Sequence, residues 1–190
     1  MVFPVYASVA LLGLAMGAQL MGRSHLLLFL KIFFPLSVTL VLSIAGYFTY
    51  LQYESWSVNP LGKFYLPPHQ GIDYFLFYTG TRIWGPWLIA LAAAVLFGFL
   101  AHYFNRRFSE RFFEQEEPWL FALGAFLTGY PGFLLYLVGV LFFGVLLSIS
   151  YSLFSKGRAQ LYWLWLPSAL FVILMVQFVI PRGFLVQFNL

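Results

Sequence analysis

The chain has 190 residues, of which 62% are hydrophobic, 22% aromatic and only 8% charged, and its mean hydropathy is +0.88. This composition excludes an ordinary soluble globular domain and places the chain among membrane proteins. Without cysteine, it has neither a disulfide framework nor a thiolate metal site. The net charge of +4 does not indicate nucleic-acid binding, because the basic residues lie at the ends of apolar runs, as membrane topology requires.

The first apolar run extends over residues 1–22 and has no basic residue ahead of it, whereas Arg23 follows it. This order predicts a retained transmembrane helix and not a cleaved signal peptide. Gly13 and Gly17 have the spacing of a small-residue face. We expect this face to pack inside the bundle, with homodimerisation as the alternative.

The apolar runs predict an all-α, polytopic integral membrane bundle of about six helices in a single transmembrane domain, residues 1–190. About 20 apolar residues in a helix span a hydrocarbon core roughly 30 Å thick. The fourth run is short because Gly129-Tyr130-Pro131-Gly132 ends it. It is either a short helix, which we favour, or half of a re-entrant hairpin with the next run. The expected helices lie near 2–21, 26–52, 83–104, 118–129, 132–154 and 162–181.

Residues 53–82 are expected to form an aromatic loop on the outer side. Asn59-Pro60 and Pro67-Pro68 interrupt this segment, and its many rings favour the headgroup layer. The loop would lie on the membrane surface, or else form a lid over a lateral groove.

The basic residues predict the orientation of the bundle. An excess of Lys and Arg marks cytoplasmic loops, and the counts favour both termini outside in the plasma (inner) membrane. Lys31, inside the second run, is expected to extend toward the nearby inner face or to pair with Glu116 or Glu117. The inner group is Arg23, Lys31, Arg106, Arg107, Arg111, Lys156 and Arg158; the outer group is Lys63, Arg82 and Arg182.

Four of the six acidic residues lie in a short inner segment, which is therefore a candidate for chemistry. Glu116 and Glu117 before Pro118 are also typical of a helix start, since carboxylates complement the helix dipole there. The expected charged patch consists of Arg106, Arg107, Glu110, Arg111, Glu114, Glu116 and Glu117, in which the arginines pair with Glu110 and Glu114. His25, His69 and His102 are too dispersed for a ligand set, so we expect neither a metal nor a cofactor.

Two stretches carry a family resemblance: Ala122-Leu123-Gly124-Ala125 after Glu116, and Gly13-Leu14-Ala15-Met16-Gly17-Ala18 in the first run. They resemble the type IV prepilin peptidases, the GxGD intramembrane aspartyl proteases. The resemblance implies a membrane peptidase with an aspartate at the position of Glu116. The chain departs from that pattern, because Glu114-Gln115-Glu116 has no glycine and the family's four-cysteine zinc module is absent. Asp73 is the only aspartate and lies on the opposite side of the expected topology.

The sequence therefore predicts a small membrane protein without evident catalytic machinery. It would be a structural or interaction component that packs with membrane lipids or partner proteins, and it could be a degenerate relative of the prepilin peptidases. One alternative is an active peptidase that uses Glu116 with a second carboxylate. Another is a small transport or substrate-binding subunit with a polar cavity beneath residues 53–82.

Overall fold

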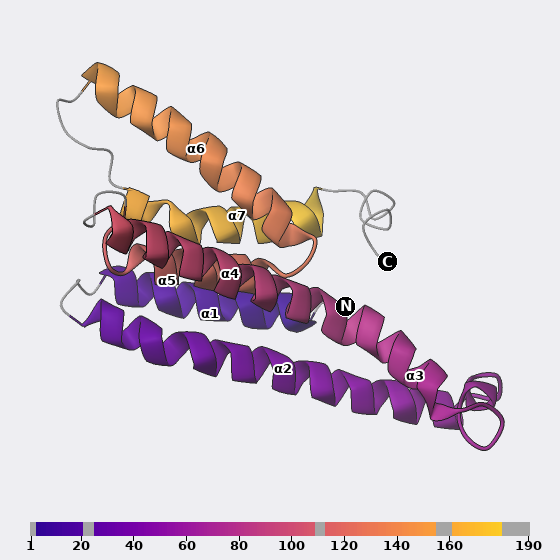
Figure 1. The fold of residues 1–190 in the computed structure, drawn as a ribbon. Coiled ribbons are helices and arrows are strands. Elements are labelled where there is room, and N and C mark those ends of the chain that lie inside the picture. Colours follow the sequence, from indigo (N-terminus) through magenta and orange to yellow (C-terminus); the bar gives the residue numbers. More distant parts are fainter. Residues whose placement is uncertain (1–2, 21–24, 109–112, 155–160, 180–190) are drawn as a thin grey trace.

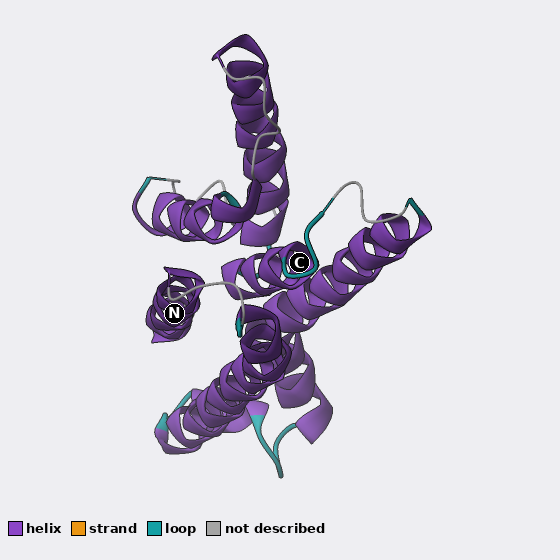
Figure 2. Ribbon diagram, turned by 90° about the vertical axis from the view of Figure 1, so that its left-hand side faces the viewer, coloured by secondary structure: helices purple, strands orange, loops and turns teal. Residues whose placement is uncertain are grey.

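The computed structural model of the protein describes residues 3–20, 25–108, 113–154 and 161–179, and these contain helices and no strand. Successive helices run in alternating directions, and a view turned by 90° shows the same all-helical arrangement (Figures 1 and 2). With the continuous helix Ile72–Arg107 counted as one, the described residues form six helices. The predicted all-α bundle of six helices is confirmed. The elements are α1 (Phe3–Leu20), α2 (Leu26–Val58), the 3-10 turn η1 (Gly62–Tyr65), α3 (Ile72–Thr79), the π-helical turn η2 (Gly80–Trp84), α4 (Gly85–Arg107), α5 (Glu117–Thr128), α6 (Gly132–Phe154), the 3-10 turn η3 (Leu161–Trp163) and α7 (Trp165–Phe178).

Three of these segments are long and apolar enough to cross a membrane: α2, the continuous helix Ile72–Arg107 formed by α3, η2 and α4, and Gly132–Ser150 in α6. Helices α1 and α7 are apolar but shorter. Large apolar side chains such as Leu28 and Leu36 on α2 and Phe142 on α6 are exposed. Such surfaces are typical of helices that face lipid, because a soluble domain seldom exposes continuous apolar area of this extent.

The short helix α5 forms the centre of the bundle, and nine of its twelve residues are buried. It contacts α1, α2, α4, α6 and α7. By helix geometry its length is roughly 18 Å, which is too short for the hydrocarbon core. Its apolar residues are therefore buried against neighbouring helices and not against lipid. The favoured prediction of a short helix agrees with this central position.

Helix α5 runs antiparallel to α4. A side chain at Gly98 of α4 would lie 3.2 Å from Cβ of Ala122 in α5. At the other end, Gly129 has a positive φ of 64° and would place a Cβ 3.3 Å from the ring of Trp87. The N–H of Tyr130 also donates to the carbonyl of Pro86 at 3.1 Å. These contacts fix the register of α5 against the first two-thirds of α4.

The prediction of a loop over 53–82 was wrong for most of that segment. Helix α2 continues to Val58, because the first helix breaker is Asn59-Pro60, and residues 72–84 are helical as α3 and η2. The ring of Trp56 lies 4.9 Å from that of Tyr78 and 5.5 Å from that of Phe75. These rings hold α3 beside the end of α2, so only residues 59–71 connect the two elements, through η1.

The expected close packing at Gly13 and Gly17 is not formed by the described residues, since no atom of another described element lies within 4 Å of a Cβ built at either position. The reason is that α1 contacts α2, α5 and α7 through another face, which carries Leu12 and Ala15. The alternative role of the two glycines in homodimerisation stays a prediction. Helix α6 contacts α5 and α7 near its start and then extends away from the bundle (Figure 1).

Candidate functional site

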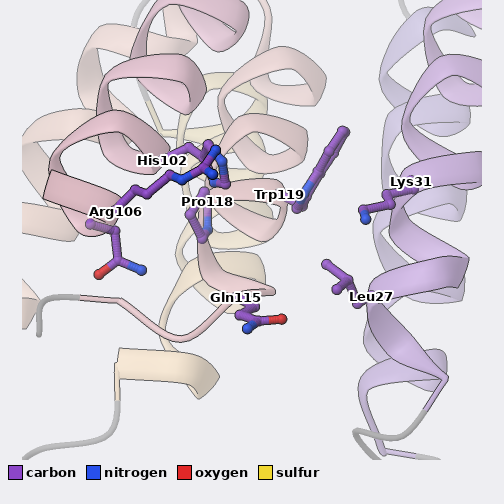
Figure 3. A pocket seen from close by; sticks show the side chains of 8 residues that line it. Leu27, Lys31, His102, Arg106, Gln115, Pro118 and Trp119 are labelled. Carbon is purple, nitrogen blue, oxygen red and sulfur yellow. The ribbon is translucent and has the colours of Figure 1, made fainter. Parts of the chain in front are cut away.

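A cleft opens between α2 on one side and α4 and α5 on the other (Figure 3). It lies near the start of α2 and the end of α4, at the opposite end of these helices from residues 59–71 (Figure 1). It has two adjoining parts, of about 330 Å³ and about 460 Å³, which share Lys31, His102, Pro118 and Trp119 as lining residues. Each part has the size of a ligand pocket, for which about 300–1,000 Å³ is typical.

The first part is the basic mouth of the cleft. Lys31 extends from α2, while His102 and Arg106 lie one turn apart on α4, on the opposite wall (Figure 3). Pro118 and Trp119 at the start of α5 lie between these two walls. No acidic residue is among the lining residues described, which are Leu27, Lys31, His102, Asn105, Arg106, Gln115, Pro118 and Trp119.

The second part is the apolar channel, which continues from the mouth along α4 and α5. Phe34 of α2 contacts Trp119 edge-to-face, with 6.1 Å between the ring centroids. Val95 and Phe99 of α4 are 56% and 64% exposed and form the outer rim, so the channel is open toward the side of the bundle. The channel is lined by Lys31, Phe34, Ala94, Val95, Gly98, Phe99, His102, Pro118, Trp119 and Ala122.

The mouth of the cleft exists because α5 begins too late to fill the space between α2 and the end of α4. The start of α5 is level with Gly98, whereas α4 continues to Arg107, roughly 13 Å further at the helical rise. The described residues that precede α5, 113–116, are not helical. Asn105 holds the end of that segment, because its amide accepts from the N–H of Phe113 at 2.9 Å and donates to the carbonyl of Phe113 at 2.7 Å.

The acidic segment lies beside the cleft and forms the start of α5. Glu117 is buried, with 4% of its surface exposed, and its Oε2 accepts from the N–H of Glu114 at 3.1 Å. The N–H of Glu117 in turn donates to the carbonyl of Glu114 at 3.1 Å, so the two residues close a turn immediately before α5. The structure thus supports the helix-start interpretation for Glu117, which turns its carboxylate back onto its own chain.

Burial raises the pKa of the Glu117 carboxyl above its ordinary value, and the negative charges of Glu114 and Glu116 raise it further. The N–H of Glu114 opposes this shift. The indole N–H of Trp165 also lowers the pKa to a smaller extent, although it forms no hydrogen bond of normal geometry with any described residue. On balance, the pKa of the Glu117 carboxyl is raised in the folded protein.

Stability should therefore fall as the pH rises through the pKa of folded Glu117. A pKa that is higher in the folded state stabilises the fold fully below the unfolded pKa, and this contribution disappears as the group ionises. We expect Glu117→Gln, whose amide oxygen can still accept from Glu114, to remove that part of the pH dependence. Thermal unfolding in detergent between about pH 4.5 and 8 measures this pH dependence of stability, with Glu116→Gln as the control. A Glu117→Gln protein clearly less stable than the wild type at the alkaline end would contradict this.

Glu116, the weak catalytic candidate, is half-buried at the N-cap of α5. Its carbonyl accepts from the N–H groups of Trp119 and Leu120. Asp73 lies in α3, roughly 35 Å away along α4 at the helical rise, which rules it out as a partner carboxylate. The acidic residues whose charges raise the pKa of Glu117 are Glu114 and Glu116, which belong to the same short segment. No cluster of metal-binding residues is found in the described ranges.

The predicted charged patch is brought together in part. Arg106 and Arg107 end α4, where cations complement the helix dipole, and Arg106 faces the cleft. Among the described residues, neither Arg106 nor Arg107 forms an ion pair, and the expected pairing of Glu114 with Arg111 involves a residue outside the described ranges. Glu110 and Arg111 lie outside the described residues.

The sequence placed Lys31 and His102 near the inner face of the bundle, but it did not predict that they line the same cleft. Lys31 forms no salt bridge with Glu116 or Glu117 in the structure and lines the cleft instead. The spacing of His102 and Arg106, four residues apart on one helix, was the available signal for a basic face. Comparison of the chain with models of protein families, with curated proteins and with solved structures gives no match.

Proposed function

We propose that the protein is a non-catalytic membrane component that holds a membrane lipid in the cleft between α2 and α4. The observation that carries this proposal is the continuity of the cleft. A polar, basic mouth at the end of the bundle leads into an apolar channel that opens sideways. An amphipathic molecule lying parallel to the helices would match both parts at once.

The surface around the channel supports entry from the bilayer. A shallow apolar hollow on α4 shares Val95 and Phe99 with the channel and continues along the same helix. Its other lining residues are Leu88, Leu91, Ala92 and Leu96. A lipid chain could therefore move from the outer surface of α4 into the channel without crossing a polar barrier.

The proposal includes the orientation and the cellular context. Arg106, Arg107 and Lys31 lie at the same end of the bundle, and the positive-inside rule assigns that end to the cytoplasm. With six alternating helices, both termini would then lie outside, in a plasma membrane. Partner proteins would dock on the part of α6 that extends from the bundle, where Leu141, Val145 and Ile149 are exposed.

The peptidase alternative has less support from the geometry. It needs two carboxylates that share a proton, and the described acidic residues near Glu116 are Glu114 and Glu117, of which the latter is turned onto backbone. The kinship with the prepilin peptidases stays a prediction. Cleavage of a prepilin substrate by the wild-type protein, and its loss in a Glu116→Gln protein, would establish the protein as a peptidase.

A bulky side chain at the rim should displace the lipid. We expect Val95→Trp to lower the amount of lipid that stays bound after detergent exchange several-fold, because the indole would occupy the channel entrance. Native mass spectrometry of the purified protein counts the retained lipids. The matched control is Val145→Trp on α6, since Val145 is 57% exposed and lies away from the cleft.

Both tryptophan variants should fold normally, because both positions are exposed. Equal lipid retention in the Val95→Trp, Val145→Trp and wild-type proteins would refute the cleft as a lipid site.

A further inference from the structure

We infer that the cleft selects a phospholipid with a net anionic phosphate headgroup, which Lys31 and Arg106 bind from opposite walls of the mouth. This inference rests on the proposed lipid-binding function and names the ligand class.

The first argument is the charge of the mouth. Lys31 on α2 and Arg106 on α4 face the same space, and His102 adds a third nitrogen-bearing side chain (Figure 3). Neither Lys31 nor Arg106 has an ion-pair partner among the described residues. Two cations that form no ion pair with any residue in the described ranges, held on separate helices around one opening, create a field that an anion would neutralise. Arg and Lys are also the side chains that most often bind phosphate.

The second argument concerns the nearby acids, which would compete with an anion if they faced the cleft. None of Glu114, Glu116 and Glu117 lines the mouth, and Glu117 directs its Oε2 to the N–H of Glu114. The first-turn N–H groups of α5 are also occupied. Those of Trp119 and Leu120 both donate to the carbonyl of Glu116, so the headgroup would be bound by side chains.

The third argument identifies a lipid as the source of the phosphate. Lys31, His102, Pro118 and Trp119 line both the mouth and the apolar channel, so the anion site and the channel are continuous. A soluble phosphate would leave the channel of about 460 Å³ without an occupant. A phospholipid would fill both parts, with its acyl chain against Phe34 and Val95.

The test compares lipids and charge variants in one assay. Native mass spectrometry of the full chain in detergent measures the Kd of phosphatidylglycerol, which is anionic, and of phosphatidylcholine, which is zwitterionic. The charge variant is Lys31→Gln with Arg106→Gln. The control is Lys63→Gln with Arg82→Gln, which removes the same charge from exposed side chains at the other end of the bundle.

We expect phosphatidylglycerol to bind the wild type about tenfold or more tightly than phosphatidylcholine. The charge variant should lose this preference, while the control keeps it. Equal affinity for the two lipids, or the same loss in the control, would overturn the inference. Displacement of phosphatidylglycerol by equimolar glycerol phosphate would also overturn it, since the site would then bind a soluble phosphate. If Val95→Trp releases both lipids but the charge variant releases neither, the headgroup inference fails while the proposed function stands.

Discussion

Gly124→Leu should prevent the bundle from assembling around α5. A Cβ at Gly124 would lie 2.6 Å from Oη and 2.8 Å from Cζ of Tyr136 on α6, and 3.3 Å from Cβ of Ala169 on α7. Three helices meet at this point, and the ring of Tyr136 is fully buried and stacked on that of Phe121, with 5.8 Å between the ring centroids. Overpacking commonly costs about 1–3 kcal/mol, and a clash with a fixed ring should reach or exceed the upper end.

Gly13→Leu is the matched control, because no atom lies within 4 Å of a Cβ at Gly13. Size-exclusion chromatography and thermal unfolding in detergent should show a monodisperse Gly13→Leu protein and an aggregated or much less stable Gly124→Leu protein. Similar unfolding temperatures for the two variants would show that α5, α6 and α7 do not pack as described.

Phe126→Ala should destabilise the protein by on the order of 3 kcal/mol. The side chain of Phe126 is fully buried in α5, and its ring lies 6.2 Å from those of Phe34 on α2 and Trp87 on α4. Its removal would leave a cavity where α5 bridges α2 and α4. Because the cleft depends on that bridge, lipid retention should fall together with stability.

Phe142→Ala on α6 is the control for the loss of an aromatic side chain, since Phe142 is 59% exposed. Chemical unfolding monitored by circular dichroism compares the two variants. An equal effect of the two substitutions would contradict the central position of α5.

Much of the fold could be predicted from the sequence, because apolar runs and helix breakers are local signals. Helices α1, α2, α5 and α6 begin within a residue or two of the expected positions, and Gly129 ends α5 as its neighbours indicated. The segment 53–82 was misjudged because its aromatic residues were interpreted as membrane-surface groups. In the structure, Trp56 packs against Tyr78 and Phe75, and such contacts between helices leave no local pattern.

The candidate site was predicted only in part. Arg106 and the acidic start of α5 were identified from their charge, but the cleft depends on the register of α5 against α4. That register follows from Gly98 against Ala122 and from Gly129 against Trp87, which are pairs of residues distant in sequence. Lys31 therefore could not be assigned to the wall opposite Arg106 from the sequence alone.

The most direct test of the central claim is photo-crosslinking with a phosphatidylglycerol that carries a diazirine midway along one acyl chain. The protein is reconstituted in an excess of unlabelled phosphatidylcholine, and the labelled residues are mapped by mass spectrometry. The account predicts that label concentrates on Phe34, Val95 and Phe99 in the wild type. In the Val95→Trp protein, label should disappear from Phe34 and Phe99. Label spread evenly between the cleft and the exposed face of α6 at Val145 and Ile149 would contradict it.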